Sequence, residues 1–265
     1  MGVLRLFVEV ESSARATGDR VEAPLDPASA HHAHRVRRLS AGAVVEVVEP
    51  SGRVLTVTLE SAPSAVLSGT VTSIAEPRQG PRIALFQGMP KGDKLDLVVA
   101  KATEIGVDTV VPVIFERSVV DLSAPKRAAR GERLRRVALA AAKQSRRDSV
   151  PTVIDPVDLA EAIPMLAEYD TVLLALEDGL VTRVDAALSG DAGCDSVAIV
   201  VGPEGGFADR ELERLLATGA TPVTLGPNIL RTETAGIVAS AIIAYHLYGL
   251  RPGDETSAEI EIVGE

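Results

Sequence analysis

Two stretches near the C-terminus decide how this chain folds: AIVVGPEGGFADRELERL at residues 198–215 and TPVTLGPNILRTETAGIVAS at residues 221–240. Each begins with a short apolar run, passes through a turn that contains glycine and proline, and ends in a helical segment. Asp209 starts the first helix, and Thr232 is suited to cap the second. Because strand, tight turn and helix in succession form the unit of a parallel sheet, both stretches predict an α/β fold.

From Arg82 onward the chain repeats this alternation of strand-length and helix-length segments. Strands are predicted at residues 82–88, 109–115, 151–155, 170–177, 196–202 and 221–226. Helical segments begin near Lys91, Lys126, Val157, Val181, Asp209 and Thr232. Several of the runs are too apolar for a sheet with one wet face, which indicates a parallel sheet covered by helices on both sides. Ligands of such sheets bind beyond the carboxyl ends of the strands, so a site is expected in the turns that follow them.

The first 75 residues or so are typical of a small β-rich domain, because short apolar runs alternate there with turns. The runs lie at residues 4–10, 44–61 and 65–74. Pro77, Gly80 and Pro81 then fall close together, which is typical of a linker. We therefore expect a first domain at 1–76, a second at 82–250, and a frayed acidic tail at 251–265.

One helix interrupts the β-rich part, over residues 28–39. Asp26 is suited to cap it, Pro27 to occupy its first position, and Gly42 to follow its end. Its histidines are His31, His32 and His34. They have no cysteine partner and stand in an arginine-rich helix, so no metal site is predicted.

The composition is that of an ordinary folded protein, with 265 residues, 46% of them hydrophobic and 24% charged. The single cysteine, Cys194, excludes an intrachain disulfide and a cysteine-built metal cage, which favours a reducing, cytoplasmic setting. No apolar run approaches the roughly 18 residues of a membrane span, and the N-terminus lacks a secretion signal. We therefore expect no membrane partner.

The charge is unevenly distributed. A net charge of −10 argues against a nucleic-acid partner, yet residues 126–147 contain nine basic residues and one acidic residue, Glu132. Such segregation suggests a surface that faces a polyanion on an otherwise acidic body. Four arginines recur at intervals of three on the predicted helix: Arg127, Arg130, Arg133 and Arg136. The alternative is an ordinary solvated helix face.

Two constellations could carry chemistry. Gly202, Gly205 and Gly206 offer backbone N–H groups to a ligand, and Glu204 adds an acceptor; the alternative is a tight connection. The turn lacks the G-x-G-x-x-G spacing of nicotinamide dehydrogenases. Polar residues 231–234, between apolar flanks, indicate a functional cluster or a capping box with a paired arginine. Lys101 and Glu104, farther upstream, are either catalytic or a buried ion pair between helix and sheet.

The pair VGPEGGF and LGPNILRTETA resembles the signature of the SPOUT methyltransferases, in particular the bacterial 16S ribosomal RNA uracil-N3 methyltransferase family. Further matching stretches are GMPKGDKLDLVVAKATEIGV, VIFERSVV, ALAAAKQSRR and HHAHRVRRLSAGAVV, so the resemblance spans nearly the whole chain. It implies a PUA-like N-terminal β-barrel domain that binds RNA, and a SPOUT α/β domain with a parallel sheet and a C-terminal trefoil knot. It also implies a homodimer that binds S-adenosyl-L-methionine and acts on 16S ribosomal RNA in the small ribosomal subunit.

The resemblance also implies site residues. Those for the cofactor are Leu174, Leu176, Glu177, Gly202, Pro203, Glu204, Gly205, Gly206, Leu225, Gly226, Ile229, Leu230, Arg231, Thr232, Thr234 and Ala235. Those for RNA are His32, Arg35, Arg38, Arg133, Arg136, Lys143, Arg146 and Arg147. Methylation of uracil N3 requires a proton acceptor and a donor to the developing oxyanion, but no metal. Arg231 is the candidate donor, and Glu233, before Glu204, the candidate acceptor.

One position departs from the resemblance. The family commonly has a basic residue where this chain has Asn228, which puts one phosphate or substrate contact in doubt. Two alternatives stay open. The acceptor could be a ribose 2′-oxygen or a tRNA guanine, or the chain could be a non-catalytic RNA-binding factor in ribosome assembly.

Overall fold

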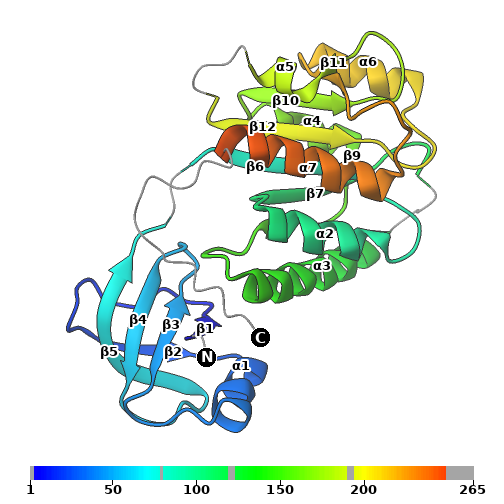
Figure 1. Ribbon diagram of the computed structural model, residues 1–265. Helices are drawn as coiled ribbons and strands as arrows, with labels where there is room; N and C mark the ends of the chain where they lie inside the picture. The colour runs from blue at the N-terminus through cyan, green and yellow to red at the C-terminus, as the bar shows by residue number, and fades with distance from the viewer. Residues whose placement is uncertain (1–2, 78–79, 119–122, 190–193, 249–265) are drawn as a thin grey trace, which may run out of the picture.

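The computed structural model describes residues 3–77, 80–118, 123–189 and 194–248. Its N-terminal part is a mixed sheet (Figure 1) of β1 Leu4–Phe7, β2 Arg20–Pro24, β3 Val44–Val48, β4 Val54–Leu59 and β5 Val66–Ala75. The strand order is β1-β3-β4-β5-β2; β1 pairs with β3 in parallel, and the other pairs are antiparallel. The predicted apolar runs are confirmed as strands. β2 was not predicted, because its short sequence RVEAP contains two charges and a proline.

The predicted helix is shorter than expected. Asp26 accepts a hydrogen bond from the Ser29 backbone N–H at 2.9 Å, as predicted for a cap. The helix begins as α1 Pro27–His31, continues as the π-helical turn η1 His32–Val36, and then ends. The predicted end at Leu39 is three residues too late: η1 ends at Val36, Arg38 takes a left-handed conformation, φ 51°, and the partly buried Leu39 packs against the core of the sheet.

The second sheet is entirely parallel, as predicted. Its strands are β6 Arg82–Gly88, β7 Thr109–Ile114, β8 Thr152–Val153, β9 Val157–Asp158, β10 Thr171–Ala175, β11 Thr182–Arg183, β12 Ser196–Val201 and β13 Thr221–Thr224. The order is β11-β13-β10-β12-β6-β7-β8, with β9 beside β7. The two-residue strands β9 and β11 were not predicted, since segments so short carry no periodicity.

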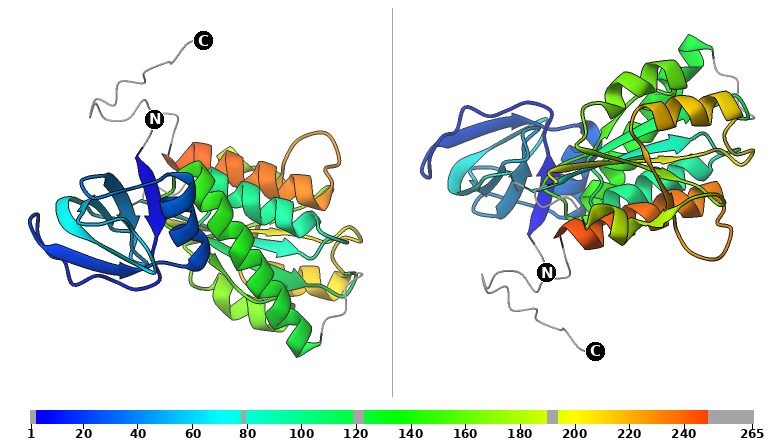
Figure 2. Two further views of the ribbon diagram at one scale, coloured as in Figure 1. Left: turned by 90° about the horizontal axis from the view of Figure 1, so that it is seen from below. Right: turned by 90° about the horizontal axis from the view of Figure 1, so that it is seen from above.

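Helices cover both faces of this sheet, as the views from below and from above in Figure 2 show. They are α2 Lys94–Ile105, α3 Ala124–Ser145, α4 Leu159–Leu166, α5 Val184–Leu188, α6 Asp209–Ala217 and α7 Thr232–Tyr248. Their predicted starts agree for α6 and α7 and differ by two or three residues for the others. None of the described helices is long and apolar enough to cross a bilayer.

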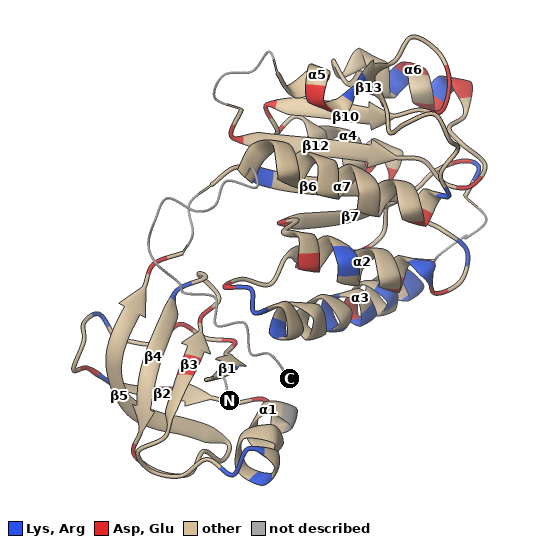
Figure 3. Ribbon diagram, viewed as in Figure 1, with Lys and Arg blue, Asp and Glu red and all other residues tan. Residues whose placement is uncertain are grey.

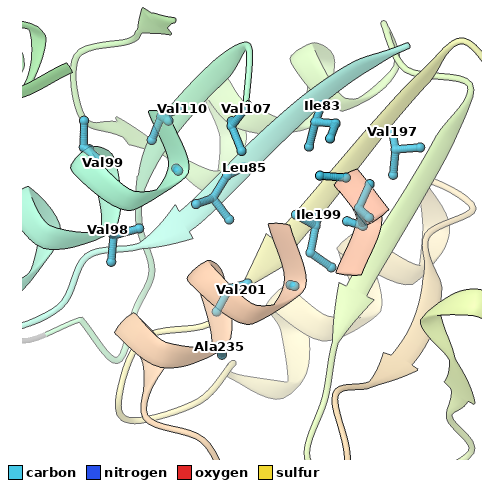
Figure 4. Packing of buried hydrophobic residues seen from close by; sticks show 14 of the residues in the cluster. Ile83, Leu85, Val98, Val99, Val107, Val110, Val197, Ile199, Val201 and Ala235 are labelled. Atoms are coloured by element: carbon cyan, nitrogen blue, oxygen red, sulfur yellow. The ribbon is translucent and has the colours of Figure 1, made fainter. Parts of the chain in front are cut away.

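Alternating side chains of β6 enter the two cores. Ile83 and Leu85 pack against α2 and α7 on one face, where Ile199 of β12 joins them (Figure 4). Phe86 points to the opposite face, where α4 and α6 supply Leu166 and Leu215. Burial of both faces is what makes the strands continuously apolar, and it fixes the register of the carboxyl ends of the strands.

The two sheets are joined through the C-terminal part of α3. A small apolar cluster spans the junction: Phe7, Val48, Val54 and Ala142, with Leu139 partly buried beside them. Arg5 of β1 donates to Glu46 at 2.7 Å and to Asp148, just beyond α3, also at 2.7 Å. It also donates to the carbonyls of Arg146 and Arg147, directly after α3, where a cation is favourable to the helix C-terminus.

Candidate active site

A cleft of about 890 Å³ lies beyond the carboxyl ends of β10, β12 and β13 and beside the first turn of α7. These strand ends and the start of α7 share one edge of the sheet (Figure 1). The predicted site residues that line it are Leu176, Glu177, Gly202, Pro203, Glu204, Gly205, Gly206, Leu225, Gly226, Ile229, Leu230, Arg231, Thr232 and Ala235. The two glycine turns, which are separate in the sequence, therefore form one site.

Three predicted residues lie outside the lining of the cleft. Leu174 is fully buried in the core beneath it, because alternate residues of β10 point to opposite faces. Thr234 is exposed on α7, on the far side of the helix turn from the cleft-lining residues. Glu233 is buried next to the lining residue Thr232 and reaches the site through Lys94.

The glycines of the site serve close packing. A Cβ at Gly88 would lie 2.5 Å from the Pro203 nitrogen and 2.6 Å from the Gly202 carbonyl carbon. A Cβ at Gly205 would lie 2.9 Å from the Cβ of Arg117. The reading of the turn as a tight connection is therefore correct at these positions, and the same lack of side chains leaves the backbone of Gly202, Gly205 and Gly206 exposed to the cleft.

A chain of hydrogen bonds fixes the start of α7 to the first glycine turn. Gln87, at the end of β6, is fully buried and donates from Nε2 to the Thr232 hydroxyl at 2.9 Å. That hydroxyl donates in turn to the Gly202 carbonyl at 2.5 Å. The prediction that Thr232 caps α7 with its side chain is therefore wrong: the helix begins there, but the hydroxyl links two loops instead.

Lys94, the first residue of α2, links the start of that helix to the start of α7. The Lys94 ammonium lies 3.2 Å from one carboxylate oxygen of Glu233 and 3.7 Å from Glu204. Glu204 also accepts a hydrogen bond from the Lys91 backbone N–H at 3.0 Å. Lys94 was not among the predicted site residues, although it stands in the quoted stretch GMPKGDKLDL. The only available signal was that resemblance, because a lysine in the first turn of a helix is unremarkable by itself.

The electrostatics keep Glu233 ionised. Burial by itself raises its pKa, but a hydrogen bond from its own backbone N–H, the ion pair with Lys94 and the charge of Arg231 outweigh burial and lower the pKa below its ordinary value. The second carboxylate oxygen is buried and accepts no hydrogen bond from any residue that the structure describes. A carboxylate held in this way is a poor proton acceptor, and it is well suited to orient Lys94.

Arg231 stands exposed at the cleft, directly before α7. Its backbone carbonyl accepts a hydrogen bond from the Ala235 N–H at 2.8 Å, but within the described ranges its side chain forms no hydrogen bond and no ion pair. The alternative of a capping box with a paired arginine is therefore not what the structure contains. A guanidinium with free donors at the mouth of a cleft can bind a carbonyl oxygen, a carboxylate or a phosphate.

Basic residues recur along α3 (Figure 3), but most of the arginines in its N-terminal half form ion pairs. Arg130 and Arg133 both pair with Asp96, at 3.2 and 2.7 Å, and both reach Asp93 as well. Arg127 lies 2.9 Å from Asp158. Asp93 directly precedes α2, Asp96 lies in it and Asp158 belongs to β9, so a count of charges along α3 could not include these acids. Arg133 is therefore paired with two carboxylates in the structure, and its contact with RNA stays a prediction.

The other residues predicted to contact RNA fall into two groups. Arg147 points into the protein and donates to the Thr103 and Val107 carbonyls at 3.0 and 2.7 Å, which closes the C-terminus of α2. The structure thus gives it a structural contact instead of an exposed position. The exposed or half-buried remainder is His32, Arg35, Arg38, Arg136, Lys143 and Arg146.

The structure also bears on the Lys101–Glu104 pair and on possible metal ligands. Lys101 and Glu104 are three residues apart on α2 and form an ion pair of 2.8 Å that is open to solvent, so the idea of a buried pair between helix and sheet is wrong. In the part of the chain that the structure describes, no three His, Cys, Asp or Glu side chains gather as metal ligands would.

Comparison with known proteins shows which family the chain belongs to. The family described as RNA methyltransferase domain matches residues 77–244, which is more than half of the chain and includes every residue that lines the cleft. The chain belongs to this RNA methyltransferase family. Its membership confirms the resemblance inferred from the two glycine turns.

The similarity to individual proteins also includes part of the chain before residue 77. It is 34% identical over 231 residues to the Ribosomal RNA small subunit methyltransferase E of Bacillus subtilis (strain 168), covering 85% of this chain and 90% of that protein. It also resembles two solved structures, each 26% identical. One, from Neisseria gonorrhoeae, is a Ribosomal RNA small subunit methyltransferase E bound to S-adenosyl methionine (TM-score 0.75, covering 91% of this chain and 97% of that one). The other is a Legionella pneumophila methyltransferase in complex with the same cofactor (TM-score 0.76, 92% and 97%).

Proposed function

We propose that this protein transfers a methyl group from S-adenosyl-L-methionine to N3 of a uridine in the 16S ribosomal RNA of the small ribosomal subunit. The observation that carries the proposal is the convergence of both glycine turns and Arg231 on one cleft in a chain of the RNA methyltransferase family. The relatives from Bacillus subtilis and Neisseria gonorrhoeae are small-subunit ribosomal RNA methyltransferases, and the latter binds S-adenosyl methionine.

The cleft suits this cofactor in size and chemistry. Its volume of about 890 Å³ lies within the range of small-molecule sites. The backbone at Gly202, Gly205 and Gly226 can come close to an adenine ring and its ribose, and Leu176 and Leu225 offer apolar contact. Glu177 and Glu204 add negative charge for a cationic ligand. When bound, S-adenosylmethionine supplies a methyl group on a positive sulfonium, which needs no metal to activate it.

The residues at the mouth of the cleft would handle the uracil. Arg231 can donate to the O2 or O4 atom on which charge develops once the N3 proton leaves. Glu233 is held as a carboxylate against Lys94, which supports a role in placing Lys94 beside the base. Glu204 is exposed in the cleft and is the better placed of the two carboxylates to accept the proton, directly or through water. This reverses the order that the sequence suggested.

The finer features of the fold are part of the proposal. The mixed sheet would be the PUA-like barrel of an RNA-binding domain at residues 1–76, and the parallel sheet the SPOUT domain at 82–250, with residues 251–265 as an acidic tail. The position of β13 between β10 and β11 supports a chain that threads a trefoil knot there. We also propose a homodimer in the cytoplasm. Ile229, at the cleft, is 78% exposed and gives such a dimer an apolar contact.

Contact with RNA would come from exposed basic residues on both domains. They are His32, Arg35, Arg38, Arg136, Lys143 and Arg146. Asn228 lines the cleft where the family commonly has a basic residue, so we expect the cofactor loop to bind without the phosphate or substrate contact that a basic residue would make there. This leaves more of the RNA affinity to residues outside the cleft.

The proposal is tested with undermethylated small ribosomal subunits. The purified protein and S-adenosylmethionine are incubated with them, and reverse-transcription stops are mapped, because a methyl group at N3 blocks Watson–Crick pairing. A new cofactor-dependent stop at one uridine is the expected result. Methyl incorporation without a stop would move the acceptor to a ribose or another base edge. No incorporation into subunits or naked RNA would favour the non-catalytic assembly factor.

A further inference from the structure

A second cleft, of about 600 Å³, lies between the N-terminal sheet and the C-terminal half of α3. Residues 3–6, which include most of β1, line it one after another. Successive side chains of a strand point to opposite faces, so consecutive residues line one cleft along the edge of the strand. Among the described strands β1 pairs only with β3 and stands at the end of the sheet, on the side of α3 (Figure 2). The second cleft therefore contains an open strand edge.

The walls beside this edge are basic and partly apolar. None of the described residues that line the cleft is acidic. Lys143 lies 3.6 Å from Asp26, and Arg146 is exposed and forms no ion pair within the ranges that the structure describes. Val3 is 48% exposed. The other lining residues used in this argument are Leu4, Leu6, His32, Arg37 and Ala140. The cleft thus suits an added strand that carries acidic side chains on one face and apolar side chains on the other.

Such a strand is present in this chain's own acidic tail. The sequence AEIEIV occupies residues 258–263, which lie outside the described part of the chain. Glu259 and Glu261 alternate with Ile260 and Ile262, which is the period-two pattern of a strand with one acidic and one apolar face. Residues 251–265 contain five acidic residues and one basic residue. The tail therefore complements the cleft in both charge and pattern.

The described chain ends close to the second cleft. Tyr248 ends α7, and a Cβ at Gly106 would lie 3.8 Å from its ring. The next carbonyl, that of Val107, accepts from Arg147 at 2.7 Å, and the Arg147 carbonyl accepts from Arg5 of β1 at 3.1 Å. Only these contacts separate Tyr248 from β1. Residues 249–258 span up to about 33–36 Å when extended, which is ample for the connection.

We propose that residues 258–263 pair with the open edge of β1 and place Glu259 and Glu261 beside Lys143 and Arg146. Strand addition gives affinity through main-chain hydrogen bonds, and alternate side chains give selectivity. Because the strand is tethered to α7, its effective concentration at the cleft is on the order of millimolar, so even a weak contact is populated.

The docked tail is an autoinhibitory contact. Its carboxylates occupy basic side chains that the proposed function assigns to RNA, so tail and RNA compete for the cleft. This effect on RNA rests on the proposed function, whereas the contact between tail and β1 does not. RNA that enters the cleft displaces the tail, and a polyanion without enough affinity to do so is excluded.

The contact is tested in the full chain with Ile260→Pro, because proline has no N–H and does not fit the interior of a strand, while the charge of the tail is unchanged. Thr256→Pro is the matched control, since it makes the same replacement in the tail outside the proposed strand. Amide hydrogen exchange is measured at β1 and at residues 258–263. We expect exchange at both segments to be roughly fivefold or more faster in Ile260→Pro than in wild type and in Thr256→Pro.

A second pair of variants tests the charges. Glu259→Gln with Glu261→Gln keeps the strand pattern and removes its two carboxylates, and Asp254→Asn with Glu255→Gln removes two acids from the tail before the strand. Binding to a 16S ribosomal RNA fragment is followed by fluorescence anisotropy. We expect Ile260→Pro and the Glu259–Glu261 variant to bind RNA about three- to tenfold more tightly than wild type, and both controls to stay within twofold.

Several results would overturn the inference. Equal exchange at β1 in wild type and Ile260→Pro would do so, as would an equal effect of Thr256→Pro. Protection of β1 that rises with protein concentration would mean that a second copy supplies the strand. Unchanged RNA affinity in Ile260→Pro, together with faster exchange at β1, would disprove the competition. If no variant and no wild-type protein binds RNA, but exchange at β1 still depends on Ile260, the contact stands and the proposed function fails.

Discussion

The replacement Thr232→Val tests the link between the two cofactor turns. Valine keeps the shape of threonine and removes only the hydroxyl. That hydroxyl accepts from Gln87 at 2.9 Å and donates to the Gly202 carbonyl at 2.5 Å, and Thr232 is 6% exposed. A buried polar group left without its partner costs about 1–3 kcal/mol. The Gln87 amide keeps a bond of 3.1 Å to the Gly88 carbonyl, so its loss is partial.

The sum for the two affected groups is a loss of about 2–4 kcal/mol in the free energy of unfolding. Since both linked segments line the first cleft, affinity for S-adenosylmethionine should also fall, by about tenfold or more. Denaturant unfolding measures the first quantity and isothermal titration calorimetry the second. Thr232→Ser, which keeps the hydroxyl, is the matched control and should stay close to wild type in both.

One result would refute this reasoning. If Thr232→Val unfolds within about 0.5 kcal/mol of both wild type and Thr232→Ser, the hydroxyl contributes no net stability. A loss of stability with unchanged cofactor affinity would separate the two claims, because it would show that the bonds hold the fold without shaping the cleft.

Three other predictions follow from single residues. Arg231→Ala should abolish methyl transfer and leave unfolding unchanged, since the exposed guanidinium has no partner in the described ranges; full activity in a filter assay would remove it from the mechanism. Arg147→Gln should cost roughly 2–4 kcal/mol of stability through the lost bonds to the Thr103 and Val107 carbonyls, without altering the salt slope of RNA binding. Burial raises the pKa of Glu49, but hydrogen bonds from Ser12 and the charge of Arg53 outweigh burial and lower the pKa below its ordinary value of 4.5. The ionised carboxylate therefore stabilises the fold above pH 4.5, and this stabilisation is lost as the pH falls through the lower pKa of the folded state. Glu49→Gln should flatten the acid side of a profile of unfolding free energy measured from pH 7 to about 3.

The candidate site was mostly predictable from local sequence. Apolar runs followed by the turns at 202–206 and 226–227 carried enough information to place the site at the strand ends, because the parallel topology brings those ends together. Lys94 was missed because its importance depends on Glu233 and Glu204, which lie over a hundred residues later in the chain. The ion pair between Glu233 and Lys94, which argues against Glu233 as the proton acceptor, was not predicted for the same reason.

The sequence by itself determined the alternation of strands and helices, the division into a β-rich and an α/β part, and the positions of both glycine turns. These follow from periodicity and turn chemistry, which are local. Only the tertiary structure decided which charges remain available: α3 carries a run of arginines, but Asp93, Asp96 and Asp158 neutralise its first half, and Arg147 turns inward to close α2. Whether a basic side chain can bind a further anion depends on the acidic side chains beside it, and packing brings those acids from distant parts of the chain.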